Sequence, residues 1–474
     1  MDFTMACEIP KNSFIGMLII FKCDKTVSNQ GLYEYIKEML EKRWWGKDHQ
    51  YVKKFFTTIK EFMGYLYLET IPLTVENCVL ELPTVEGDLD KKGLLNLISA
   101  CYYKPFPLNN TALWDVHIGK QPLIWREKDN EDVHYFPMFF RIHHCIADGV
   151  TLIKLFTRAL ADFKQGDLEI PDVFNAHQGQ ESPIKRIVKY IFEFLKIIIY
   201  FVGVSYVYLV LKGHDNNELC RKNIGNREFL DFYVDEDGTF FLKVKEIKRN
   251  YPGTSFSAIL ISAYSASLND YYKTYCSTCP DYITITVPLI RSLKMLTEIT
   301  TGIKHLKYIT LKNGFIYLQI KLPINIKNNK YYDENYPLIS RLDLIRTAID
   351  LMKDSAEVAI TDILISRIKC LFPVWVQKPY HSMQSPSTIG SFPPGPPTFS
   401  YGNGIFTATD TIFFVPHILC LPLTFMCTTY ENRLTFTMNY NAYTDAEEYP
   451  IDEILQNTYK YIDLLQKEIN KKFK

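Results

Sequence analysis

The stretch from Val133 to Phe163 constrains the fold of this chain most, because its hydrophobic pattern changes period around a doubled histidine. Residues 133–142 (Val-His-Tyr-Phe-Pro-Met-Phe-Phe-Arg-Ile) have the composition of a strand and run into His143-His144-Cys145-Ile146-Ala147-Asp148-Gly149. After Gly149 the apolar residues recur at helical spacing, at Leu152, Ile153, Phe156, Leu160 and Phe163. The pattern predicts a strand–turn–helix unit with the histidines at the turn, where reactive side chains are often exposed.

Strand-like and helix-like segments are interspersed along the whole chain, which predicts an α/β fold with mixed sheets. Strands are expected at residues 14–21, 239–244, 282–289, 315–322, 412–415, 421–427 and 434–440. Helices are expected at residues 32–40, 255–268 and 338–358 and after Pro450. Residues 386–397 hold five prolines and two glycines and are expected to form a loop without a strand. A chain of 474 residues exceeds one ordinary core, so we expect two large halves, 1–184 and 214–474, joined by a segment at 185–213.

Composition narrows the class of protein. Apolar residues make up 47% of the chain, which excludes wholesale disorder. Basic and acidic residues balance at 53 each and no basic stripe is present, so nucleic acid is a poor partner. Cysteines are scattered, and the close pair Cys276 and Cys279 lacks the second pair that a metal site would need. The apolar stretch at residues 14–21 is too short for a secretory signal, so we expect a protein that faces the cytosol.

A long apolar segment separates the two expected halves. Residues 197–211 hold no charge over 15 positions, and extension back to Ile187 admits Lys189, Glu193 and Lys196. This run is shorter than the roughly 20 apolar residues that span a bilayer. Three interpretations remain: a membrane-embedded or re-entrant helix, a buried helix, and a hydrophobic lid over the substrate. The tyrosines along it favour membrane contact through residues 187–211, whereas spanning stays open.

The doubled histidine offers a base for acyl transfer. Transfer to a hydroxyl needs a group that deprotonates the alcohol near neutral pH, and a neutral imidazole has a suitable pKa. His144 would be this base, with His143 as a supporting group, Asp148 as a structural brace and Gly149 to permit a tight turn. Two other interpretations exist. The histidines could be core residues with Asp148 as the N-cap of the next helix, or Cys145 could be a nucleophile, which would need a separate base.

The motif at residues 143–149 resembles the His-His-x-x-x-Asp-Gly signature of the chloramphenicol-acetyltransferase-like superfamily. The rest of the chain resembles one branch of it, the wax ester synthase/diacylglycerol acyltransferases, whose further motifs follow here in the same order. They are similar to Pro107–Val116 (ending in Leu-Trp-Asp-Val), Thr254–Leu260, Thr286–Arg291, a helix with Pro337, Arg341, Leu342, Lys353 and Ser355, Ser391–Pro396, and Thr429 through Asp445. Phe256-Ser257 stand where the branch has Asn-Asp, Phe392-Pro393 stand where it has Asn-Val, and the element ending at Arg291 is one residue short.

The resemblance implies two subdomains, each like a chloramphenicol acetyltransferase monomer, that form a pseudo-dimer with the active site at their interface. It implies transfer of a fatty acyl group from acyl-CoA to a long-chain alcohol, giving a wax ester, or to diacylglycerol, giving triacylglycerol. Arg291 would be the partner of Asp148, no metal or other cofactor would be needed, and the enzyme would reside at the endoplasmic reticulum membrane, with a transmembrane helix if residues 187–211 span it. The alternatives are a catalytically silent lipid-binding relative and an acyltransferase that acts on a small soluble acceptor.

Overall fold

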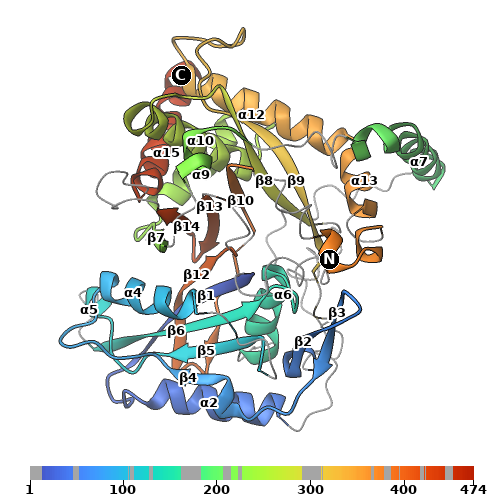
Figure 1. The fold of residues 1–474 in the computed structure, drawn as a ribbon. Coiled ribbons are helices and arrows are strands. Elements are labelled where there is room, and N and C mark those ends of the chain that lie inside the picture. The colour runs from blue at the N-terminus through green and yellow to red at the C-terminus, as the bar shows by residue number, and fades with distance from the viewer. Residues whose placement is uncertain are drawn as a thin grey trace.

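The chain forms two six-stranded sheets, a two-stranded hairpin and helices that cover the sheets (Figure 1). The computed structural model describes residues 13–45, 53–104, 106, 111–127, 132–161, 183–206, 215–222, 227–290, 311, 313–364, 368–377, 386–393, 395–416, 421, 423–442 and 452–473. The strands are β1 Phe14–Asp24, β2 Thr57–Phe62, β3 Tyr65–Thr70, β4 Val79–Glu81, β5 Trp114–Ile118, β6 Val133–His143, β7 Arg227–Val234, β8 Tyr282–Ile290, β9 Phe315–Pro323, β10 Thr388–Ser391, β11 Ser400–Tyr401, β12 Phe406–Phe414, β13 Leu423–Tyr430 and β14 Arg433–Ala442. The helices are α2 Gly31–Trp44, α4 Lys91–Tyr102, α5 Ile124–Glu127, α6 Gly149–Lys154, α7 Pro183–Tyr206, α8 Glu218–Lys222, α9 Thr239–Asn250, α10 Phe256–Tyr275, α12 Pro337–Asp354, α13 Glu357–Ile363 and α15 Asp452–Phe473, with short helical turns at η1 Lys54–Phe56, η2 Val75–Asn77, η3 Leu155–Leu160 and η8 Lys369–Leu371.

The first sheet is built around β1, in the strand order β11-β12-β1-β6-β5-β4. β1 pairs antiparallel with β6 and β12, whereas β4 and β5 pair in parallel, so the sheet is mixed. Alternate residues of a strand point to opposite faces, and Met17 and Ile19 enter one core while Leu18 and Ile20 enter another. Because both faces of β1 are covered, its sequence is apolar without alternation.

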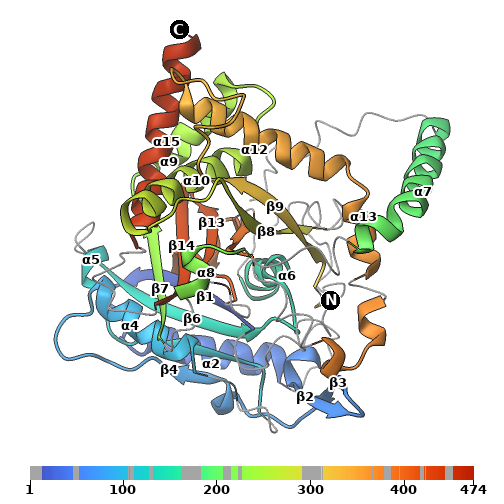
Figure 2. The ribbon, with the colours of Figure 1, turned by 45° about the horizontal axis from the view of Figure 1, so that its top comes forward.

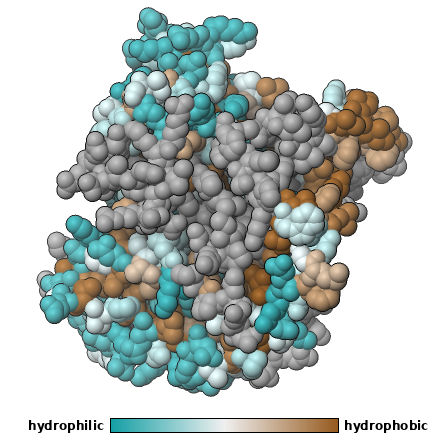
Figure 3. Space-filling model, in the orientation of Figure 1, coloured by the Kyte–Doolittle hydropathy of each residue, from teal (hydrophilic) through white to brown (hydrophobic). Residues whose placement is uncertain are grey.

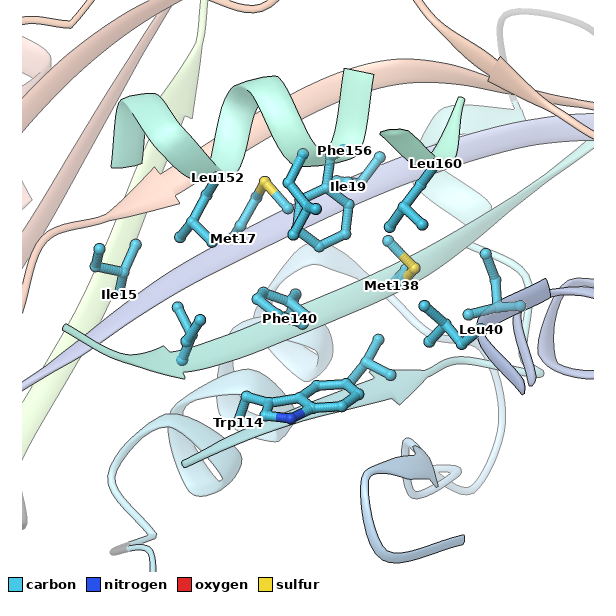
Figure 4. Close-up of a cluster of buried hydrophobic side chains, with 14 of the residues drawn as sticks. Ile15, Met17, Ile19, Leu40, Trp114, Met138, Phe140, Leu152, Phe156 and Leu160 are labelled. Carbon is cyan, nitrogen blue, oxygen red and sulfur yellow. The ribbon is translucent and has the colours of Figure 1, made fainter. Parts of the chain in front are cut away.

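The helix that follows the histidine motif packs on the first sheet. Figure 4 shows Leu152 of α6 and Phe156 of the next turn over Met17 of β1 and Phe140 of β6, in the same core as α2. Each of these four side chains is at most 4% exposed. This packing holds the start of α6, and therefore the motif, against the end of β6.

The second sheet has the strand order β7-β14-β13-β10-β8-β9, with β10 parallel to both of its neighbours. Helices α9, α10, α12 and α15 gather on it in both views (Figures 1 and 2). The expected α/β fold with mixed sheets is therefore confirmed. Part of the second half of the chain belongs to the first sheet, because β11 and β12, from residues 400–414, complete that sheet.

Two predictions of secondary structure were wrong. Residues 239–244 were expected to be a strand, but they begin α9, because Phe241, Val244 and Ile247 recur every third residue and are buried on one face. Residues 386–397 were expected to lack a strand, but Thr388–Ser391 form β10. Its backbone can pair because the prolines of this stretch stand outside these four residues. The expected helix at 338–358 is also divided, since α12 ends before Ser355.

The apolar segment between the halves forms α7, which projects from the body of the molecule (Figures 1 and 2). Ile197 and Phe201 pack on Ala356, Ile360 and Leu364 of the α13 region. Most of its other described apolar side chains are exposed, with Ile199 at 70% and Val202 at 77%, so the buried-helix interpretation is wrong for this part.

Within the described ranges, no helix is long and apolar enough to cross a membrane, and the expected transmembrane helix therefore finds no support. Lys189, Glu193 and Lys196 interrupt the apolar run of α7. Residues 207–211 of the predicted membrane segment lie outside the described residues.

Candidate active site

The histidine motif is fixed by the two strands on either side of β6. The His143 N–H donates to the Leu113 carbonyl at 2.8 Å, next to β5, and the His144 N–H donates to the Ser13 carbonyl at 2.7 Å, next to β1. The Ile146 N–H then closes the turn on the His143 carbonyl at 3.0 Å. The predicted strand–turn–helix is therefore present, with both histidines buried.

Asn313 sets the tautomer of His144. The side-chain amide of Asn313 donates from Nδ2 to the His144 carbonyl at 2.7 Å, and its Oδ1 lies 2.8 Å from His144 Nδ1. Because Oδ1 can only accept, the imidazole proton must be on Nδ1. Nε2 is then the nitrogen with the lone pair, which is the atom that a general base needs.

The segment that holds His144 comes from the other half of the molecule. Asn313 is 3% exposed and precedes β9, and the Phe315 ring lies 5.2 Å from the His144 ring between centroids. Lys54 reinforces the contact, because its Nζ donates to the Ile146 carbonyl at 2.8 Å and to the Leu311 carbonyl at 3.4 Å. The motif therefore lies where the two halves meet, as the pseudo-dimer predicts.

Asp148 binds two backbone amides. Its Oδ1 accepts from the Thr151 N–H at 2.8 Å, which makes it the N-cap of α6, and its Oδ2 accepts from the Gly314 N–H at 2.7 Å. The carboxylate thus joins α6 to the segment that carries Asn313. Both of these contacts are to backbone amides, and the proposed cationic partner, Arg291, lies outside the described residues.

His143 is held neutral in the core. It is 0% exposed, and its Nδ1 accepts from the Cys145 N–H at 3.2 Å, so its proton is on Nε2. Burial and the adjacent His144 lower the pKa of His143 to about 3. Its ring meets Phe14 edge-on at 6.0 Å. His143 therefore contacts the backbone of the turn, and its lowered pKa favours the neutral form near neutral pH.

Gly149 differs from its expected role, and the location of Cys145 speaks against its alternative role as a nucleophile. Gly149 is the first residue of α6, it does not have a positive φ, and a Cβ built on it would meet nothing within 4 Å. Among the described residues, nothing beside this position requires glycine. The Cys145 side chain is 1% exposed within the first core, which suits a small buried hydrophobe and not a nucleophile.

A buried ion pair stabilises the strands that lead to the motif. Arg141 Nε donates to Asp115 Oδ1 at 3.0 Å, Nη2 donates to Oδ2, and Nη1 donates to the Cys101 carbonyl at 2.6 Å. Burial raises the pKa of Asp115, but His117 and Arg141 lower it more, so the net pKa is below the ordinary value. Asp115 belongs to the segment Pro107–Val116 of the family resemblance, and its ion pair joins β5 to β6.

Sequence reasoning missed Asn313. Its only local signal is the Asn313-Gly314 pair before the strand at 315–322, which indicates a turn and says nothing of a contact 169 residues away. Within the described ranges, no three His, Cys, Asp or Glu side chains gather in a way that could hold a metal ion.

Comparison with known proteins identifies the fold. No protein-family model and no curated protein sequence matches the chain. Solved structures do match over almost the whole length. Wax ester synthase/diacylglycerol acyltransferase from Marinobacter aquaeolei VT8 is similar with a TM-score of 0.58 at 13% identity, covering 98% of this chain and 95% of that one. Trichothecene 15-O-acetyltransferase TRI3 from Fusarium sporotrichioides gives 0.59 at 12% identity, covering 97% and 93%.

A third match is a condensation domain. The first condensation domain of the CDA synthetase is similar with a TM-score of 0.54 at 12% identity, covering 99% of this chain and 94% of that one. Identities this low establish the fold and leave substrates and site roles to be argued from the residues. The resemblance predicted from the sequence is thus confirmed at the level of the fold: this chain has the two-domain, chloramphenicol-acetyltransferase-like fold of wax ester synthase/diacylglycerol acyltransferase and of condensation domains.

Proposed function

We propose that the chain is an acyl-CoA-dependent O-acyltransferase with His144 as its general base. The observation that carries the proposal is the pair of hydrogen bonds between Asn313 and His144, at 2.8 and 2.7 Å, which leaves the lone pair on Nε2. Asn313 therefore fixes both the ring orientation of His144 and the nitrogen that can accept a proton. The location of this pair between the two halves also suits a reaction of two substrates.

In the proposed reaction Nε2 of His144 removes the proton from the acceptor hydroxyl as its oxygen attacks the thioester carbonyl. The tetrahedral intermediate collapses with cleavage of the C–S bond, and the imidazolium returns the proton to the CoA thiolate. The products are an ester and free CoA, so no covalent enzyme intermediate and no cofactor are needed. Asp148 and His143 position the loop and do not carry the transferred proton.

We further propose that the acceptor is a lipid, either a long-chain alcohol or diacylglycerol. The similarity to a wax ester synthase/diacylglycerol acyltransferase supports this class of acceptor. The exposed apolar side chains of α7 support it too, because an enzyme at a membrane meets such acceptors without extracting them into water, at about 0.8 kcal/mol per exposed CH₂. We expect residence at the endoplasmic reticulum membrane, with α7 in the interface and the catalytic body in the cytosol.

The test of function is incubation of the purified protein with palmitoyl-CoA and a panel of long-chain alcohols, diacylglycerol and short soluble alcohols. CoA release and ester formation are both measured. We expect ester from a lipid acceptor, and a loss of about two to four orders of magnitude in His144→Ala with the fold retained. Near-normal turnover in His144→Ala contradicts the mechanism.

The same assay separates the alternatives. Ester formation with only the short alcohols would indicate a small soluble acceptor. Binding of palmitoyl-CoA without CoA release for any acceptor would indicate a silent lipid-binding protein. Hydrolysis of palmitoyl-CoA that persists in His144→Ala would show that the release of CoA does not come from this site.

Membrane residence is tested by fractionation of the full-length protein with and without Ser at Ile198, Ile199 and Val202, which are 57%, 70% and 77% exposed. We expect the wild type with the endoplasmic reticulum membranes and the variant largely released. Recovery of the wild type wholly in the soluble fraction would leave the lid over the substrate as the remaining interpretation of α7.

A further inference from the structure

The β2–β3 hairpin presents apolar side chains at its tip. Phe62 is 68% exposed and Met63 is 80% exposed, although both could be polar without loss of any core contact. The hairpin pairs Phe62 with Tyr65, so Met63 and Gly64 alone form the turn. An exposed tip of this kind is ordinarily polar.

The conformation of the turn makes Met63 more unusual. Met63 has a φ of 51° and Gly64 a φ of 81°, the combination found in two-residue hairpin turns that prefer Asn-Gly. A methionine in the left-handed region costs roughly 1 kcal/mol relative to glycine or asparagine. The chain therefore keeps an apolar residue in a strained conformation where 80% of its surface is exposed.

A second segment, more than 300 residues away in sequence, adds to the same surface. The Val374 N–H donates to the Gly64 carbonyl at 2.7 Å, and the Tyr65 hydroxyl donates to the Leu371 carbonyl at 2.9 Å. Beside these contacts, Leu371 is 69% exposed and Trp375 is 70% exposed. We call Phe62, Met63, Leu371, Phe372 and Trp375 the tip surface.

The tip surface is held rigidly. Gln377 is 2% exposed, and its Nε2 donates to the carbonyls of Lys369 at 2.9 Å and Phe372 at 2.6 Å. Gly64 fits closely, because a Cβ there would lie 2.9 Å from Pro373 Cβ. The apolar side chains are thus presented on a fixed scaffold built from both halves of the chain.

We propose that the tip surface enters the interface of an anionic lipid bilayer together with α7. Monomeric proteins rarely expose a large contiguous apolar surface without a partner, and Trp, Tyr and Phe favour the headgroup region. The tip surface and α7 lie on the same side of the molecule in both ribbon views (Figures 1 and 2), joined by α13. Figure 3 shows hydrophobic side chains along that side.

Charge favours a bilayer over a second copy of this chain as the occupant. The sequence of α7 carries Lys185, Arg186, Lys189 and Lys196 against the single acid Glu193. Such a helix is attracted to anionic headgroups. A symmetric contact through this side would instead bring the two basic segments together, which opposes association. This inference rests on the proposed membrane residence and adds a second, separate point of contact.

The fluorescence of Trp375 measures directly whether the tip surface enters the bilayer. Of the five tryptophans, Trp44 and Trp114 are buried and Trp45 and Trp125 are partly buried, whereas Trp375 is exposed. The full-length protein is mixed with vesicles of phosphatidylcholine and phosphatidylserine in equal parts, with bromine on the acyl chains as a quencher. We expect quenching of the wild-type fluorescence and its loss in Trp375→Phe, which keeps the apolar ring and still sediments with the vesicles.

Met63→Asn tests the proposal because it should affect thermal stability and vesicle binding in different directions. The substitution relieves the turn, so the melting temperature should stay or rise, while partitioning onto the vesicles falls about tenfold through loss of the apolar side chain. Leu242→Ser is the matched control, because Leu242 is 61% exposed on α9, away from the tip surface (Figure 1). We expect no change in its vesicle binding.

Each outcome of these experiments decides one part of the proposal. Sedimentation with vesicles but no quenching of Trp375, or unchanged partitioning in Met63→Asn, overturns the tip surface and leaves α7 as the membrane contact. Absence of any vesicle binding by the wild type overturns the membrane residence as well, while ester formation with a lipid acceptor in detergent would still support the proposed chemistry. Dimerisation that Trp375→Ser abolishes would replace the bilayer with a second copy.

Discussion

At the scale of single residues, His144 depends on Asn313 for the position of its proton. Removal of the amide in Asn313→Ala would let the imidazole rotate and change tautomer, so we expect kcat to fall about 10- to 100-fold, as for other residues that orient an imidazole. The protein should remain folded, as judged by circular dichroism. An unchanged kcat would show that the hydrogen bonds at 2.8 and 2.7 Å do not position the base.

Asn313→Asp keeps the acceptor that faces Nδ1, loses the donor to the His144 carbonyl and adds a negative charge. The carboxylate can still accept from Nδ1, but its negative charge stabilises the imidazolium and raises the pKa of His144. A base with a raised pKa stays protonated to higher pH, so the acidic limb of kcat/KM against pH should move to higher pH. A purely structural role of Asn313 predicts a lower rate at every pH with no shift of that limb.

His143 predicts a loss of stability in mild acid. Its pKa in the folded state is about 3 because it is buried beside His144, whereas an unfolded histidine titrates near 6.5. Between these values the unfolded chain binds the extra proton, so stability should fall as the pH drops from about 6.5 toward 3. His143→Asn keeps an acceptor for the Cys145 N–H and cannot titrate in this range. Its melting temperature should therefore depend less on pH between 5 and 7 than that of the wild type.

Asp148 acts at the junction of two elements. In Asp148→Asn one oxygen is replaced by a donor, which faces either the Thr151 or the Gly314 N–H. We expect a loss of about 1 to 3 kcal/mol in the free energy of unfolding together with lower activity. Asp148→Ser is the control, because serine keeps the helix cap but cannot also reach Gly314. A large fall in activity at an unchanged melting temperature would point to a direct chemical role.

At the scale of elements, the pairing of β5 with β6 depends on Arg141 and Asp115. Arg141→Met would leave the buried Asp115 carboxylate with His117, whose Nε2 lies 3.4 Å away, as its remaining cationic partner, and we expect a loss of about 3 kcal/mol by chemical denaturation. The double substitution Arg141→Met with Asp115→Leu removes both charges and should recover most of that loss. A double variant as unstable as the single one would show that packing, and not the buried charge, causes the effect.

The elements around the motif were predictable because the spacing of apolar residues within each segment identifies it as a strand or a helix. β1, β6 and α2 follow directly from the apolar pattern, and so does the turn between β6 and α6. α9 was mistaken for a strand because Thr239-Phe240-Phe241 favours strands by composition, while the burial of every third residue decides in favour of a helix. β10 escaped notice because its pairing with β8 and β13 comes from the tertiary fold.

At the scale of the whole molecule, the candidate site requires both halves. The turn that carries His143 and His144 was predictable from seven consecutive residues, 143–149. The residues that orient them, Asn313 and Gly314, approach only when the halves pack, and no local pattern marks that approach. The same holds for the tip surface, whose two segments are hydrophobic in sequence but meet only in the folded molecule.

The position of β12 in the first sheet determines when β1 gains its second neighbouring strand during synthesis of the chain. β1 ends at Asp24, but its partner along one edge, from Gly16 opposite Phe414 to Lys22 opposite Thr407, emerges only after residue 414 is translated. At 5–20 residues per second, β1 waits roughly 20 to 80 s for that partner. During this interval a strand rich in Ile and Phe has an open edge, which favours aggregation. Chaperones that bind extended apolar segments would have a defined target on the nascent chain, and slower translation would lengthen its exposure.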